Sequence, residues 1–308
     1  MDRKLILVTQ PTRLEELIHR YNTEGQVRFY LEHQGADYAD YRREHDTYLA
    51  AVAAAREAME PLGRVQILER SYVSRFLFGP EDLVVCVGRD GLVANVMKYL
   101  RGQCLIGVNP EPARWDGVLL PFAPKDLPLL LPEAVKGTRP SREITLAKAE
   151  LSDGQILYGV NDIFIGQRTH VSARYTLRSG TAAENQSSSG VIVSTGLGST
   201  GWLKSVLAGT AGVSRFYGKG SEHLPKDPAF PWNAKYLFFA VRKPYPSRAT
   251  GAELVFGQIT PEKPLQIVSQ MPENGVIFSD GIEADSLEFT AGLTATLGIA
   301  EHCGRLLF

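Results

Sequence analysis

The sequence has few cysteines and no excess of charge of either sign. Only three cysteines occur among 308 residues, and the positive and negative side chains nearly cancel, at a formal net charge of −1. Three cysteines are too few for a disulfide framework, so we expect a reducing compartment. Balanced charge gives no electrostatic footprint for nucleic acid or for an anionic membrane, and we expect neither as a partner.

Long apolar runs and metal-ligand spacings are also missing. No apolar run approaches the length of a membrane span. The residues 1–4 lead directly into an apolar segment that is too short for a signal peptide, so a cytoplasmic protein is expected. The six histidines form no pair at the spacing of a structural zinc site. These absences favour an ordinary globular chain, long enough for two domains.

Strand and helix signals alternate in the first part of the chain. This alternation predicts a mostly parallel, Rossmann-like sheet with helices on its faces. We therefore expect an α/β domain over residues 1–140, which ends in a proline-punctuated connector at 124–140. Strands are predicted at 5–9, 65–68, 84–87 and 104–108, and helices at 13–21, 38–62 and 92–100.

After residue 140 the strand signals crowd together, with short turns between them. This density predicts a largely antiparallel, β-rich domain over residues 141–308, whose last residues can pack back on the first domain. The stretch 218–231 is the most loop-like and is expected to be a mobile flap. Strands are predicted at 143–151, 156–158, 162–165, 171–177, 191–194, 236–241, 253–256, 265–268 and 276–279.

A glycine turn, Gly88-Arg89-Asp90-Gly91, follows the buried strand at 84–87 and precedes a helix. Gly88 and Gly91 allow the backbone to approach a ligand closely or to adopt positive φ. In open α/β sheets, phosphates and reacting groups bind where a strand's carboxyl end faces a helix N-terminus. Asp90 is the only acid in the turn and is therefore a candidate catalytic residue. The alternative is that Asp90 only caps the helix.

A second apolar strand, at 191–194, also ends in glycines and hydroxyl side chains. Backbone amides and hydroxyls at a helix start suit phosphate oxygens. The segment is not a Walker A loop, because Lys204 follows the Ser-Thr pair instead of preceding it. The alternative is a strand-to-helix connection with an ordinary cap. The candidate contacts are Thr195, Gly198, Ser199 and Thr200.

Two further acidic positions complete the candidate set. The pair Asn161-Asp162 offers amide donors and carboxylate acceptors to a ribose or a base edge, with an ordinary Asx turn as the alternative. Asp280, followed by Gly281, is a candidate metal ligand, and a plain hairpin turn is its alternative. Glycine-rich strand ends in both halves favour a ligand bound between two domains.

In this order, the Gly88–Gly91 turn, the Asn161-Asp162 pair and the segment 198–202 resemble the NAD kinase family. Members of that family carry Gly-Gly-Asp-Gly, Asn-Glu and Thr-Gly-Ser-Thr segments. The strand at 105–109 and the Asp280-Gly281 turn resemble flanking parts of the same family. The resemblance covers about residues 5–305 and is closest to the mitochondrial-type branch.

The resemblance implies an NAD kinase-like fold with the active site between its two domains, and a homodimer or higher homo-oligomer. It implies transfer of the γ-phosphoryl group of ATP to the adenosine ribose 2′-hydroxyl of NAD, giving NADP, with Mg²⁺ or another divalent metal. Asp90 would accept the hydroxyl proton, or orient the hydroxyl and the metal. Asn161 and Asp162 would hold the adenosine, and Ser199 and Thr200 the nucleotide or phosphates. The other implied binding residues are Gly88, Arg89, Gly91, Asn109, Thr195, Gly198 and Asp280.

Three positions depart from the family pattern. Arg89 replaces a glycine, Leu92 replaces a usual threonine, and Asp162 is one methylene shorter than glutamate. Arg89 either fills space that the backbone needs near phosphate or supplies a cation to the phosphates. Two alternatives therefore stand beside NAD phosphorylation. One is a kinase of the same fold for another small hydroxylated acceptor, such as a sugar or nucleoside, and the other is a catalytically weak dinucleotide-binding regulatory protein.

Overall fold

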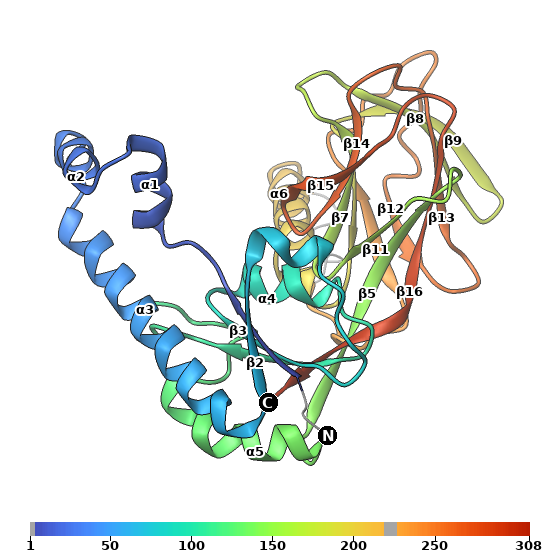
Figure 1. Cartoon of the computed structure of the whole chain (residues 1–308). Coiled ribbons are helices and arrows are strands. Elements are labelled where there is room, and N and C mark those ends of the chain that lie inside the picture. Colours follow the sequence, from blue (N-terminus) through green and yellow to red (C-terminus); the bar gives the residue numbers. More distant parts are fainter. Residues whose placement is uncertain (1–3, 219–226) are drawn as a thin grey trace. The chain divides into compact units, whose positions relative to one another are not determined.

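The computed structural model describes residues 4–218 and 227–308, which form two compact units. Unit 1 comprises Met1–Arg142 and Arg305–Phe308, and unit 2 comprises Glu143–Gly304. Figure 1 shows helices and parallel strands in unit 1 and mainly strands in unit 2. The predicted α/β and β-rich fold class is thereby confirmed. None of the described helices is both long enough and apolar enough to cross a membrane.

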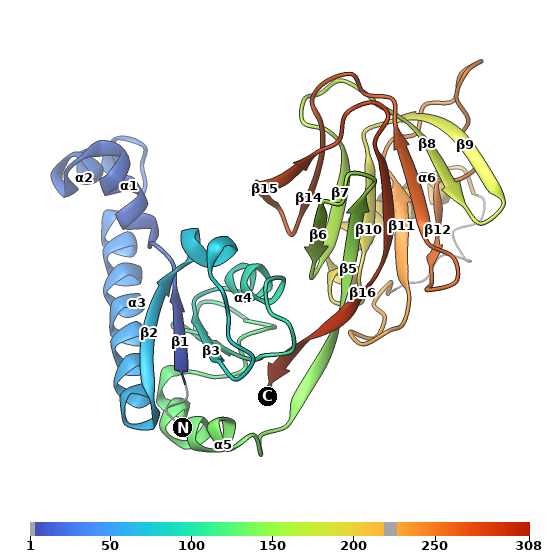
Figure 2. The ribbon, with the colours of Figure 1, turned by 45° about the vertical axis from the view of Figure 1, so that its right-hand side comes forward.

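Unit 1 is built on a parallel sheet with the strand order β2-β1-β3-β4, extended by the end of β16. Figure 2 shows α3 on one side of these strands and α4 on the other. The strands are β1 (Lys4–Thr9), β2 (Arg64–Glu69), β3 (Leu83–Val87) and β4 (Cys104–Val108). The helices are α1 (Arg13–Tyr21), α2 (Glu24–His33), α3 (Tyr38–Met59), α4 (Asp90–Met97) and α5 (Leu127–Lys136), with 3₁₀ turns η1 (Glu60–Leu62), η2 (Arg70–Arg75) and η3 (Pro124–Asp126).

The centre of this sheet is β3, in which all five residues are buried. Such a strand needs cover on both faces. Residues of α3 and α5 pack against one face, where Tyr48 and Met59 meet Leu7 and Val85. The Tyr48 hydroxyl also donates to the carbonyl of Val87, at the last residue of β3 (3.1 Å). Packing and this hydrogen bond together fix the strand end from which the glycine turn begins.

The proline-punctuated connector was predicted wrongly, because part of it is the helix α5. Pro128 lies in the first turn, where its missing N–H would have no partner in any case. Pro132 removes one internal hydrogen bond. Four buried side chains on one face offset that loss, and Gly137 ends the helix in the left-handed conformation. The buried face consists of Leu127, Leu130, Leu131 and Ala134.

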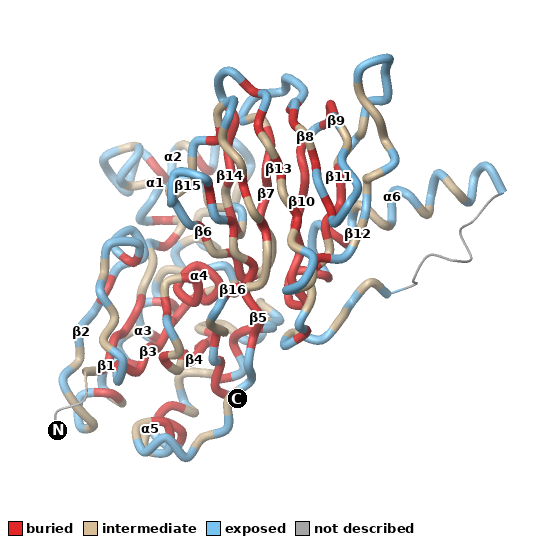
Figure 3. Tube along the Cα trace, turned by 90° about the vertical axis from the view of Figure 1, so that its right-hand side faces the viewer, coloured by how far each residue is buried: buried red, intermediate tan, exposed pale blue. Residues whose placement is uncertain are grey.

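Unit 2 is a sandwich of two antiparallel sheets. One has the strand order β16-β13-β8-β9, with β5 beside β16 and β6 beside β5, and the other has the order β12-β11-β10-β7-β14-β15. Large side chains such as Tyr175, Phe239 and Phe289 fill the core between them. Figure 3 shows burial concentrated in these strands. The strands are β5 (Ser141–Leu151), β6 (Ile156–Gly159), β7 (Asp162–Gln167), β8 (Ala173–Ser179), β9 (Ala182–Ser188), β10 (Val191–Ser194), β11 (Leu237–Val241), β12 (Phe256–Ile259), β13 (Leu265–Ser269), β14 (Gly275–Ser279), β15 (Ile282–Glu288) and β16 (Thr294–Leu307), with η4 (Gly198–Thr200) and α6 (Trp202–Phe216).

Several elements of unit 2 differ from the prediction. The strand predicted at 253–256 is β12 and begins only at Phe256, because the backbone N–H groups of Glu253 and Leu254 bind the Glu184 carboxylate instead of a strand. The polar edge strand β9 and the long strand β16 were not predicted, because no apolar pattern was recognised in their sequences. The last residues of β16 pair with β4 in unit 1. Of the flap expected at 218–231, residues 219–226 lie outside the described part of the chain.

Candidate functional site

The glycine turn of unit 1 joins β3 to α4 as expected. Gly88 donates its N–H to the carbonyl of Val108, the last residue of β4, at 3.1 Å. A Cβ at Gly88 would lie 2.9 Å from the Leu92 side chain, whereas one at Gly91 would meet open space. Neither glycine has positive φ, so the turn uses Gly88 for close packing and not for backbone freedom.

Asp90 does not cap α4. The N-cap residue is Arg89, whose side chain makes no capping bond, and Asp90 is the first helical residue. The Asp90 Oδ1 atom instead accepts the backbone N–H of Leu119 at 2.7 Å. This is the only hydrogen bond of the Asp90 carboxylate within the described residues, so its second oxygen keeps its acceptor capacity. The helix start adds the partial positive charge of its uncapped N–H groups.

Asn109 holds the loop that follows β4. Its side-chain amide donates to the Trp115 carbonyl (2.8 Å), and its Oδ1 accepts from the Glu111 N–H (3.0 Å). Asn109 is buried, and both polar ends of its side chain are engaged in these bonds. These two bonds hold the first part of the loop together, and the Asp90–Leu119 bond ties its last part to the glycine turn. The observed contacts of Asn109 are thus structural, and its predicted binding role stays a prediction.

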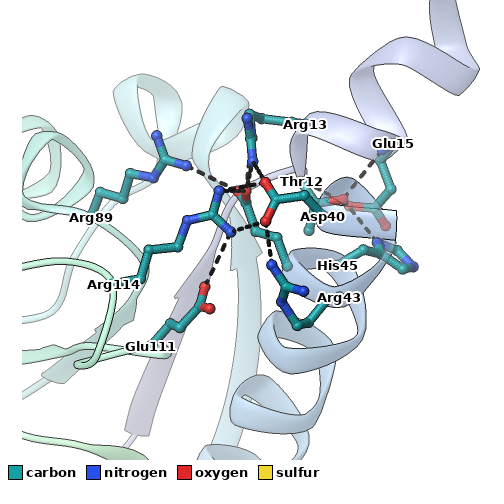
Figure 4. A network of polar contacts seen from close by, with 10 residues as sticks. Thr12, Arg13, Glu15, Asp40, Arg43, His45, Arg89, Glu111 and Arg114 are labelled. Carbon is teal, nitrogen blue, oxygen red and sulfur yellow. Dashed lines mark hydrogen bonds and ion pairs between the residues drawn. The ribbon is translucent and has the colours of Figure 1, made fainter. Parts of the chain in front are cut away.

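Arg89 has an extended backbone, with φ −110°, and is therefore not strained. Its Nη2 donates to Glu44 Oε1 on α3 at 2.9 Å, and its guanidinium lies 4.1 Å from the ring centroid of Trp115. Figure 4 shows Arg89 at one end of a network that also contains Arg114, Asp40 and Arg13. The guanidinium therefore points toward α3 and does not fill the space beside the turn's backbone.

The candidate residues of unit 2 gather around the start of β7. The Asp280 carboxylate accepts the backbone N–H groups of Val160 (3.1 Å) and Asn161 (2.6 Å). Asp280 and Gly281 both have positive φ, at 54° and 71°, and link β14 to β15 as a two-residue hairpin turn. Asp280 is consequently both a hairpin residue and the anchor of the segment that carries Asp162.

The second glycine-rich segment packs directly on this anchor. Thr195 Oγ1 donates to the Val160 carbonyl (2.6 Å) and accepts the Gly198 N–H (3.1 Å). A Cβ at Gly198 would lie 1.9 Å from the Asn161 carbonyl oxygen, so only glycine fits there. Ser199 is fully buried and donates to the Gly196 carbonyl (2.6 Å), whereas Thr200 is exposed. Of the two predicted hydroxyl contacts, Thr200 is the accessible one.

Asp162 has an unusual electrostatic environment. Its side chain makes no hydrogen bond or ion pair within the part of the chain that the structure describes. Burial, and secondly the negative charge of Asp280, raise the pKa of Asp162 to about 7. An acid that titrates near neutral pH beside a cluster of backbone polar groups is typical of binding and catalytic sites.

A metal site built from protein ligands alone is absent among residues 4–218 and 227–308, which contain no group of three or more His, Cys, Asp or Glu side chains placed for one. Mg²⁺ is commonly held by one or two carboxylates together with substrate phosphates. The free oxygen of Asp90 fits that mode. The Asp280 carboxylate is anchored on backbone N–H groups in a hairpin turn, which fits the alternative of a plain hairpin better than a metal ligand.

The structure thus brings the predicted residues together as two clusters, one in each unit. Gly88, Arg89, Asp90, Gly91 and Asn109 form the first, and Asn161, Asp162, Thr195, Gly198, Ser199, Thr200 and Asp280 form the second. Sequence reasoning missed Glu44, Asp40, Arg114 and Trp115. Arg114 and Trp115 could have been suspected, because their loop directly follows β4 and the candidate residue Asn109. In α3, by contrast, no sequence pattern singles out Glu44.

No model of a protein family and no curated protein matches the sequence. Solved structures do match over nearly the whole chain. An NAD kinase from Archaeoglobus fulgidus in complex with ATP is 17% identical, with 99% of this chain and 93% of that chain covered and a TM-score of 0.58. A yeast NADH kinase complexed with NADH is 12% identical, with 100% and 84% covered and a TM-score of 0.59. The chain therefore has an NAD kinase-like fold.

Proposed function

We propose that this protein is an ATP-dependent kinase of the NAD kinase type, which phosphorylates the adenosine ribose 2′-hydroxyl of NAD to give NADP. The observation that carries the proposal is Asp90, which begins α4 just after the buried central strand and has one carboxylate oxygen without a hydrogen-bond partner among the described residues. The shared fold and the order of the three motif segments support the same assignment.

In this proposal unit 1 binds the phosphates. Phosphoryl transfer needs alignment and charge neutralisation more than covalent chemistry from the protein. The uncapped start of α4 and the Arg89 guanidinium supply positive charge at the turn. The free oxygen of Asp90 would orient the acceptor hydroxyl and accept its proton. In the alternative role, the same oxygen would orient the hydroxyl and hold Mg²⁺ together with the nucleotide phosphates, and the metal would neutralise phosphate charge.

Unit 2 then binds the acceptor. Asn161 is held by Asp280 through its backbone N–H, which leaves its side chain for the adenosine. Asp162 has no hydrogen-bond or ion-pair partner for its carboxyl group in the described part of the chain, and it would present this group to a ribose hydroxyl, while Thr200 presents an exposed hydroxyl. A cytoplasmic location and a homodimer or higher homo-oligomer complete the proposal. The oligomer can be measured by sedimentation equilibrium.

A second candidate acceptor is another small hydroxylated molecule, such as a sugar or nucleoside. The observation that favours it is Asp162, where the family has glutamate. The shorter side chain withdraws the carboxyl group by roughly 1.5 Å, and a displacement of about 1 Å at a reacting group can cost about a hundredfold in rate. A differently shaped acceptor, whose hydroxyl reaches further toward Asp162, would restore the contact.

The experiment is a coupled assay with purified protein, ATP, Mg²⁺ and NAD, in which an NADP-specific dehydrogenase detects NADP. Asp90→Asn is the matched variant, because its side-chain oxygen still accepts the Leu119 N–H while the negative charge is lost. We expect NADP formation by the wild-type protein and its near-complete loss in Asp90→Asn. An unchanged rate in Asp90→Asn, or no NADP from the folded wild-type protein, would contradict the proposal. A screen of sugars and nucleosides then tests the second candidate.

A further inference from the structure

Arg89 is held by two side chains that do not belong to the glycine turn. Glu44 on α3 accepts one of its N–H groups, and the Trp115 ring lies under its guanidinium at 4.1 Å. Arginine on an aromatic face keeps its edge N–H donors available, because stacking uses only the flat face of the guanidinium. The Arg89 side chain remains 42% exposed, while that of Glu44 is 14% exposed. A partly buried carboxylate and an indole thus orient an arginine that is still accessible.

The charges around Arg89 do not cancel. Seven side chains are linked by ion pairs into one arginine–carboxylate cluster. Its members are Arg13, Asp40, Arg43, Glu44, Arg89, Glu111 and Arg114, so four positive groups face three negative ones. Figure 4 shows this cluster between α3 and the two loops of the candidate site.

Among the described residues, Arg43 and Arg89 each have one ion-pair partner, which other arginines of the cluster share, and of these two only Arg89 belongs to the glycine turn. Arg114 forms two parallel hydrogen bonds with Asp40, at 3.0 and 2.6 Å, and also lies within 3.8 Å of Glu111. Within the described residues, Glu44 is the only ion-pair partner of Arg89, and Glu44 is shared with Arg13 and Arg114. Arg89 is therefore oriented by its partners without being neutralised by them.

We propose that Glu44 and Trp115 are positioning residues that hold Arg89 as a receptor for the terminal phosphates of the nucleotide. The inference rests on the proposed function, which brings a nucleoside triphosphate to this turn, and it assigns to Arg89 the selection of triphosphate over monophosphate. Planar guanidinium groups bind phosphate oxygens with two parallel N–H groups, and such charge-assisted bonds are strong. The helical segment α1–α3 thereby acquires a function, because it supplies the carboxylate that orients the receptor.

The test measures the dissociation constants of ATP and AMP by calorimetry for the full chain. Arg89→Ala is expected to weaken ATP binding about 10- to 100-fold, as the loss of a charged hydrogen bond would. AMP binding is expected to change less than about twofold. Arg42→Ala is the matched control, since Arg42 also forms ion pairs from α3 but lies outside the cluster and is 47% exposed. It is expected to leave both constants unchanged.

Two charge-preserving variants test the positioning residues. Glu44→Asp withdraws the carboxylate from Arg89, and Trp115→Leu removes the ring while adding no charge. Each is expected to weaken ATP binding by about three- to tenfold. Combined with Arg89→Ala, each is expected to add nothing, because its effect passes through Arg89. A merely structural role would weaken binding equally with and without Arg89.

The outcomes separate this inference from the proposed function. Unchanged ATP affinity in Arg89→Ala, or equal losses of affinity for ATP and AMP, would contradict the role of Arg89 as a receptor for the terminal phosphates. Additive losses in the double variants would overturn the positioning roles. ATP binding with the expected pattern, but without NADP formation, would leave the receptor standing and remove the NAD kinase activity. Absence of ATP binding by the folded wild-type protein would overturn both.

Discussion

The Asp90 carboxylate accepts the backbone N–H of Leu119 at 2.7 Å, across 29 positions of sequence. The same acid that resembles the catalytic residue of a kinase motif therefore also holds the loop that carries Trp115. Asn109 holds that loop from its other end. The Asp90 side chain is consequently the predicted reacting group and also supports the loop whose Trp115 contacts Arg89.

This double role predicts different outcomes for two substitutions of Asp90. Asp90→Asn keeps an acceptor for Leu119 and should change the free energy of unfolding by less than about 1 kcal/mol. Asp90→Ala leaves that N–H without a partner and should destabilise unit 1 by about 1–3 kcal/mol. Urea unfolding at fixed pH measures both. Equal destabilisation by the two variants would show that the loop bond does not contribute.

Asp162 predicts a pH-dependent stability. Its pKa is about 7 in the folded chain and near 3.8 in an ordinary setting, so folding favours the protonated form. The stability from this group is fully present below about pH 4 and is lost as pH rises through about 7. The difference between the two pKa values corresponds to about 4 kcal/mol at most.

Asp162→Asn removes this titration. Relative to wild type, we expect the variant to gain stability progressively between about pH 4 and 7 and to keep the gain above pH 8. Urea unfolding at several pH values measures this difference. Asp280→Asn is the companion variant, because losing the neighbouring charge should move the wild-type transition to lower pH. A difference that does not depend on pH would contradict the assignment.

Local patterns in the sequence predicted the ends of two strands at the candidate site well, because these buried strands read as apolar runs that lead into glycine-containing turns. The strand at 191–194 and the turn at Gly88–Gly91 lie where they were expected. The same patterns failed for α5, where a buried leucine face outweighs two prolines, and for β9, a polar edge strand with little apolar signal.

For the candidate site too, the sequence predicted some features and missed others. Asp90, Asn161 and Gly198 were recognisable as motif residues, but the contacts of their side chains were not. Glu44 contacts Arg89 from a helix 45 positions earlier, and the carboxylate of Asp280 binds backbone groups 119 and 120 positions earlier. Such contacts arise from tertiary packing, which a single sequence does not encode in any local spacing.

Gly198 provides the most direct test of the second cluster. A Cβ there would lie 1.9 Å from the Asn161 carbonyl oxygen, so Gly198→Ala must displace backbone at the start of β7. Overpacking of this kind typically costs about 1–3 kcal/mol, and we expect that loss together with weaker binding of NAD. Gly209→Ala is the control, because a Cβ at Gly209 in α6 meets open space and should stabilise the helix by about 0.5–1 kcal/mol. Thermal unfolding and NAD titration of both variants measure these effects. If Gly198→Ala bound NAD like wild type despite its lower stability, the Asn161 segment would not contact the acceptor, and the proposed role of unit 2 would fail.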